Sequence, residues 1–169
     1  MEDKLAIINR IIEWHQTIRG HVRLVGDSIS DEEALLALEK ARLEWIPGQL
    51  EVLAEKQKKL QQAMGFLDEG LQNHFAYEEQ VLPPLLGELF MRALILDHQE
   101  IRKEISEAKS ITAGAKLEGL RREELLLQES NIKQTIQGVC QLIEEHAIRE
   151  ETILEMLQRA LQEKEGNES

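Results

Sequence analysis

Apolar residues recur at intervals of three and four along most of the chain, the spacing that places them on one face of an α-helix. Four such stripes predict four long helices, at residues 4–25, 47–82, 88–112 and 131–164. Two short extra helices are expected at 31–45 and 116–128, the first after a turn at 26–30. Long helices joined by short connections favour an all-α fold, an antiparallel up-down four-helix bundle.

Helix-breaking residues support these boundaries. Pro47-Gly48 and Pro83-Pro84 interrupt the apolar stripes, because proline lacks an N–H donor and restricts the residue before it. Ser130-Asn131 offers an N-cap for the last long helix. The 169 residues suit one domain, over 1–169, and only 4% are aromatic. A low aromatic content is typical of chains rich in helix-forming residues, and it strengthens the all-α prediction.

The charge balance narrows the classes of partner. A net charge of −12 repels phosphate backbones, so we expect no nucleic acid partner. No stretch reaches the roughly 18 consecutive apolar residues of a membrane span, and the first residues have no basic segment typical of a signal peptide. Cys140 is the one cysteine and has no intrachain disulfide partner. These features predict a cytoplasmic protein without a membrane partner.

Two similar motifs carry the candidate chemistry. His74 is followed by Glu78, and His146 is followed by Glu150. A spacing of four residues is one helical turn plus about 40°, so both side chains of each pair project from one face. Either motif alone is more typical of a solvated pair or a hydrogen-bonded core histidine than of a metal site.

The combination changes this interpretation. Four of the five histidines fall on inner stripes, one on each long helix. A bundle core holding four imidazoles and two carboxylates without a metal would be costly, since each buried unpaired polar group costs about 1–3 kcal/mol. We therefore predict that a pair of metal ions is held by His15, His74, Glu78, His98, His146 and Glu150.

The order of these residues resembles the hemerythrin, or HHE cation-binding, superfamily over nearly the whole chain. The context that carries the resemblance is Trp14-His15, His74-Phe75, Glu78-Glu79 and the run from Asp97 to Arg102. The resemblance implies a non-haem di-iron centre, with two iron ions bridged by two carboxylates and an oxo or hydroxo group. Iron is favoured over zinc or manganese.

The chain departs from the oxygen carriers of that family at two positions. Arg102 stands where they have a second histidine, one turn after His98, and a guanidinium does not ligate metals. Their last carboxylate lies five residues after the final histidine, so both Glu150 and Glu151 are candidates, and helical geometry favours Glu150. We expect Glu79 and Glu151 to be solvated or to lie outside the ligand set, and Arg102 to pair with a carboxylate such as Glu151.

Four histidines and two glutamates resemble more closely the bacterial members of the family that repair damaged iron centres. The expected function is therefore binding or sensing of dioxygen, nitric oxide or iron, with iron-centre repair as one form of it. A di-iron oxidase or nitric oxide reductase is the enzymatic alternative, and the sequence favours a non-enzymatic role. A metal-free helical interaction domain is a third alternative. The chain does not identify a protein partner.

Overall fold

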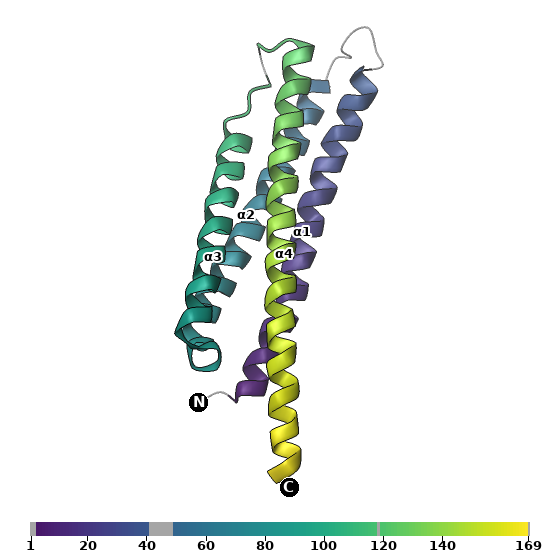
Figure 1. Cartoon of the computed structure of the whole chain (residues 1–169). Helices are drawn as coiled ribbons and strands as arrows, with labels where there is room; N and C mark the ends of the chain where they lie inside the picture. Colours follow the sequence, from purple (N-terminus) through teal and green to yellow (C-terminus); the bar gives the residue numbers. More distant parts are fainter. Residues whose placement is uncertain (1–2, 41–48, 118, 169) are drawn as a thin grey trace.

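The computed structural model describes residues 3–40, 49–117 and 119–168. These residues form four helices, α1 Lys4–Lys40, α2 Gln49–Val81, α3 Pro83–Ala113 and α4 Arg122–Glu168, and contain no strand. Figure 1 shows neighbouring helices running in opposite directions, with α1 and α3 rising and α2 and α4 descending. Contacts join α1 to α2, α2 to α3, α3 to α4 and α4 back to α1. The predicted all-α, up-down four-helix bundle is confirmed.

The first helix is longer than the sequence predicts. The turn expected at 26–30 is wrong, because α1 continues through it to Lys40 and includes the first part of the short helix expected at 31–45. Residues 41–45 of that expected helix lie outside the described part of the chain. Val25 and Ile29 are almost fully buried on one face. Their packing outweighs the helix cost of about 1 kcal/mol for a glycine such as Gly26.

The last helix also absorbs an element that the sequence separates. The extra helix expected at 116–128 is wrong as a separate unit, because α4 begins at Arg122 and passes without a break through Ser130-Asn131. Leu125 and Ile132 lie seven residues apart and are both buried, so one apolar face crosses the expected boundary.

Prolines and a glycine shape the connection between α2 and α3. The proline pair predicts the end of α2 at residue 82 correctly to within one residue, and α3 begins directly at Pro83. Gly87 breaks the regular helix near its start with a φ of 77°, a left-handed conformation that glycine adopts without a Cβ penalty. The regular helix therefore resumes at 88, where the sequence places its start. None of the described helices combines the length and apolarity needed to cross a membrane.

The apolar core is divided into two clusters. Among the residues whose burial is described, the larger contains sixteen, including Leu67, Phe75 and Ile101, and the smaller contains Ile11, Leu154 and four others. On each helix a histidine lies in sequence between members of the two clusters. The polar layer is therefore enclosed by apolar layers along the bundle axis.

Candidate metal centre

The six predicted ligands come from all four helices and meet in the polar layer. α1 contributes His15, α2 contributes His74 and Glu78, α3 contributes His98, and α4 contributes His146 and Glu150. Every one of them has a relative exposure of 4% or less. Because each helix places its residues on its apolar stripe, packing of the stripes brings them together.

Glu78 spans the cluster. Its Oε1 lies 2.5 Å from Nε2 of His74 and 3.6 Å from Nε2 of His15, whereas its Oε2 lies 3.1 Å from Nε2 of His98. One carboxylate oxygen therefore faces the histidines of α1 and α2, and the other faces the histidine of α3.

Glu150 spans the cluster in the same way. Its Oε1 lies 3.3 Å from Nε2 of His15, and its Oε2 lies 3.4 Å from Nε2 of His146. Two overlapping groups of possible ligand atoms result, each within 4.8 Å, and both groups contain Glu78 and Glu150. Two metal positions that share two carboxylates fit this arrangement.

The polar atoms of the cluster lack ordinary partners. Within the described part of the chain, no group in hydrogen-bonding geometry partners either carboxylate oxygen of Glu78 or of Glu150, or Nε2 of three of the histidines, although these atoms lie close together. A buried polar group in this state costs about 1–3 kcal/mol, and native proteins contain few of them. The unpaired atoms all point into one layer, so the residues present fit a bound cation.

Burial favours the neutral form of two of the four imidazoles, those of His74 and His98. Burial, with further contributions from neighbouring histidines, lowers the pKa of His74 to about 3. Burial also lowers the pKa of His98 to about 4. Both rings are thus neutral near pH 7 and offer a lone pair, the form in which histidine binds metals.

The two carboxylates differ in their pKa. Burial and the negative charge of Glu150 raise the pKa of Glu78 well above its usual range. Burial alone would raise the pKa of Glu150 too, but the imidazoles of His146 and His15 lower it well below its usual range. Like charges in one buried site oppose each other, and a bound cation would remove that opposition.

Comparison with known protein families decides the relationship. Residues 6–157 match the hemerythrin HHE cation binding domain. The chain belongs to this family. No curated protein and no solved structure matches it. Membership in a cation-binding family and a buried cluster able to hold a metal agree with each other, as the sequence predicts.

In this hemerythrin-family chain, one outer carboxylate orients the histidine of α1. His15 Nδ1 donates a hydrogen bond to Oε1 of Glu151 at 3.0 Å, which leaves its Nε2 lone pair facing the cluster. Arg19 donates to both oxygens of Glu151, at 2.6 and 3.0 Å. The carboxylate is held between the two groups, the arrangement that fixes the tautomer and ring direction of a metal-binding histidine.

Outer carboxylates orient two further histidines. His98 Nδ1 donates to Glu79 at 2.8 Å, and Glu79 is also paired with Arg102 at 3.1 Å. His146 Nδ1 lies 3.1 Å from Oδ2 of Asp97, and Arg149 donates to that same oxygen at 2.9 Å. Three of the four histidines thus share one pattern of imidazole, carboxylate and guanidinium.

His74 is the exception. Its Nδ1 is buried without a hydrogen-bond partner among the described residues, and its ring forms an edge-type contact with Trp14 at 5.1 Å between centroids. His21, the fifth histidine, is absent from the ligand groups and faces α2, where its ring lies against Gly70.

Several predictions about single residues are resolved by these contacts. Glu150, and not Glu151, lies within the cluster. Arg102 pairs with a carboxylate as expected, but that carboxylate is Glu79 and not Glu151, and Arg102 also donates to Gln72. The sequence predicts no role for Asp97, although Asp97 stands directly before His98 in the run that carries the family resemblance. Metal binding by the six clustered residues stays a prediction.

Proposed function

We propose that the chain holds two iron ions between its four helices and uses them to bind dioxygen or nitric oxide. The observation that supports this most strongly is the position of the two carboxylates. Each directs one oxygen toward one set of histidines and the other oxygen toward a second set. A carboxylate with this orientation suits a bridge between two ions, because each of its oxygens faces a different set of imidazoles.

The donor types favour iron. The six side chains supply imidazole nitrogens and carboxylate oxygens and no thiolate, because Cys140 is absent from both ligand groups. Structural zinc sites are closed and four-coordinate, and commonly use thiolates. Two six-coordinate ions have about twelve positions, and the eight donor atoms of these side chains leave about four for other ligands. The open positions suit binding of a small ligand.

The contacts around the cluster favour binding or sensing of a ligand over enzymatic turnover. Each carboxylate that contacts a histidine from outside is also paired with an arginine. These contacts hold the rings in place and leave no free acid among those three carboxylates to deliver protons. Iron, when bound, would supply the affinity for the gas. The chain positions the iron ligands and buries them away from water. The same centre could also take part in iron-centre repair, if the open coordination positions allow iron to be exchanged with another protein.

Metal content and the optical spectrum test the metal assignment. Protein purified in air should contain two irons per chain and absorb in the near-ultraviolet and visible range. His98→Ala should lower both the iron content and the absorption, and His21→Ala serves as the matched control that leaves them unchanged. A colourless protein with a single zinc would contradict the di-iron proposal.

Gas binding is tested separately. A reduced, anaerobic sample should change its spectrum on addition of dioxygen or nitric oxide. A di-iron protein that responds to neither gas would lack the proposed ligand-binding function.

A further inference from the structure

A cavity of about 260 Å³ lies between α3 and α4, next to the metal cluster. Its walls are mostly apolar and include Phe90 and Leu94 of α3 and Ile153 of α4. His146 and Glu150, two of the six clustered residues, also line it. The cavity therefore joins an apolar space to the centre itself.

The cavity extends from the surface to the centre. At its outer side, Phe90 is 55% exposed, and the side chain of Arg149 is also 55% exposed. At its inner side, Leu154, Glu150 and His146 are nearly inaccessible, at 0%, 2% and 4%. A molecule that enters between α3 and α4 thus reaches two of the predicted ligands along mostly apolar walls, past Asp97 and Arg149.

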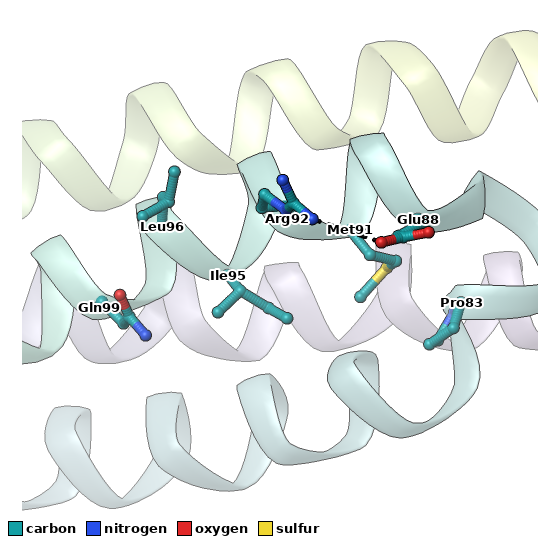
Figure 2. A pocket seen from close by; sticks show the side chains of 7 residues that line it. All are labelled: Pro83, Glu88, Met91, Arg92, Ile95, Leu96 and Gln99. Carbon is teal, nitrogen blue, oxygen red and sulfur yellow. Dashed lines mark hydrogen bonds and ion pairs between the residues drawn. The ribbon is translucent and has the colours of Figure 1, made fainter.

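Among the described residues, the cavity beside the other half of the centre is much smaller. The cavity that touches His15 and His74 measures about 10 Å³, which is room for about one water molecule. A wider hollow of about 550 Å³ follows α3, but its lining includes none of the six clustered residues (Figure 2). Of these three cavities, only the one between α3 and α4 both contacts the cluster and holds more than water.

We propose that the α3–α4 cavity admits and holds a small, uncharged, apolar ligand on its way to the His98–His146 half of the centre. The delivery of that ligand to a metal centre rests on the proposed function, whereas the binding of an apolar ligand in the cavity does not. Apolar walls favour molecules such as dioxygen or nitric oxide over hydrated anions, which would lose their water without gaining partners. The volume exceeds the share of one water, about 30 Å³, several-fold, so the cavity accommodates more than one diatomic molecule.

An ion pair links the outer side of the cavity to its floor. Asp97 and Arg149 both line the cavity, and Arg149 Nη2 donates to Oδ2 of Asp97 at 2.9 Å. The same oxygen lies 3.1 Å from Nδ1 of His146. The pair places an aliphatic arginine stem beside the entrance and at the same time orients a predicted ligand.

Xenon tests the cavity without reference to metal chemistry, because apolar cavities bind this gas. Crystals of the metal-loaded protein under xenon pressure should show a xenon peak between α3 and α4. Ala93→Trp should abolish the peak, because Ala93 lines the cavity and is exposed, so an indole there fills the entrance. Ala160→Trp is the matched control, an exposed alanine of α4 outside the lining, and should keep the peak.

The iron-loaded protein supplies the second measurement. Ala93→Trp should slow association of dioxygen or nitric oxide about tenfold with unchanged iron content, and Ala160→Trp should not. An unchanged association rate in Ala93→Trp, or xenon found only in the α3 hollow of Figure 2, would overturn the inference. Xenon bound between α3 and α4 in a protein that reacts with neither gas would instead overturn the proposed function and retain the cavity as a site for apolar ligands.

Discussion

Removing the negative charge of Glu151 should weaken metal binding although Glu151 itself lies outside the ligand set. The change Glu151→Gln keeps the shape of the side chain and one acceptor oxygen for Nδ1 of His15, which lies 3.0 Å away. It removes the charge that makes the opposite nitrogen of His15 a stronger donor to a metal. Loss of such an outer partner typically lowers metal affinity about 10–100-fold, or about 1.4–2.7 kcal/mol.

The structure places the expected effect within that range. The Glu151 side chain is 17% exposed, so solvent screens part of its charge and the loss should be nearer about tenfold. The corresponding carboxylates beside His98 and His146, Glu79 and Asp97, are 28% and 33% exposed. Their amide variants should therefore show effects no larger than that of Glu151→Gln.

Competition with a chelator of known affinity measures this effect in metal-free protein at constant pH. Glu144→Gln is the matched control, because Glu144 also accepts hydrogen bonds from Arg19, at 3.2 Å, yet lies outside the described hydrogen bonds and ion pairs of the histidines. Its metal affinity should match that of the unchanged protein. Equal losses in the two variants would mean that the contacts with Arg19, and not the charge of Glu151 beside His15, control the metal affinity.

Three further changes test the centre and the core. If the free metal concentration is about a thousandfold above its Kd, removing the metal with a chelator should lower the melting temperature by about 8–16 °C. An unchanged melting temperature would favour the metal-free interaction domain. Glu78→Ala should reduce bound iron from two ions to at most one per chain by elemental analysis, because both of its oxygens face the cluster, whereas the exposed Glu13→Ala should keep two. Leu67→Ala, at a fully buried position, should cost about 2–5 kcal/mol of unfolding free energy in urea, and Leu127→Ala, at 72% exposure, less than about 0.5 kcal/mol.

The helix boundaries show where local sequence patterns do not predict the structure. Gly26 and Ser130-Asn131 are local signals worth about 1 kcal/mol or less, and they predict breaks that the structure lacks. Burial of Ile29 and Leu125 on continuous apolar faces outweighs those signals. The proline pair after α2 predicts its break correctly, because a missing N–H and a steric clash cannot be offset by packing at that point.

The outer contacts of the centre show a different limit. Arg102 is paired across to Glu79 of α2, and Asp97 of α3 is paired with His146 of α4. Long side chains and acidic residues are frequent on every helix of this chain, so sequence spacing does not distinguish which of them meet. The choice depends on the rotation of each helix about its axis, which is a property of the packed bundle.

The sequence by itself determined the four helical faces and the six residues that converge in the polar layer. Both follow from periodicity, because residues three, four and seven apart share a face wherever the helix lies. Only the tertiary structure decided which oxygen of Glu78 and Glu150 faces which histidine, which carboxylates orient the rings, and which half of the centre is reached by a cavity. Those properties are distances between helices, and they are set by the register and spacing at which the apolar faces pack.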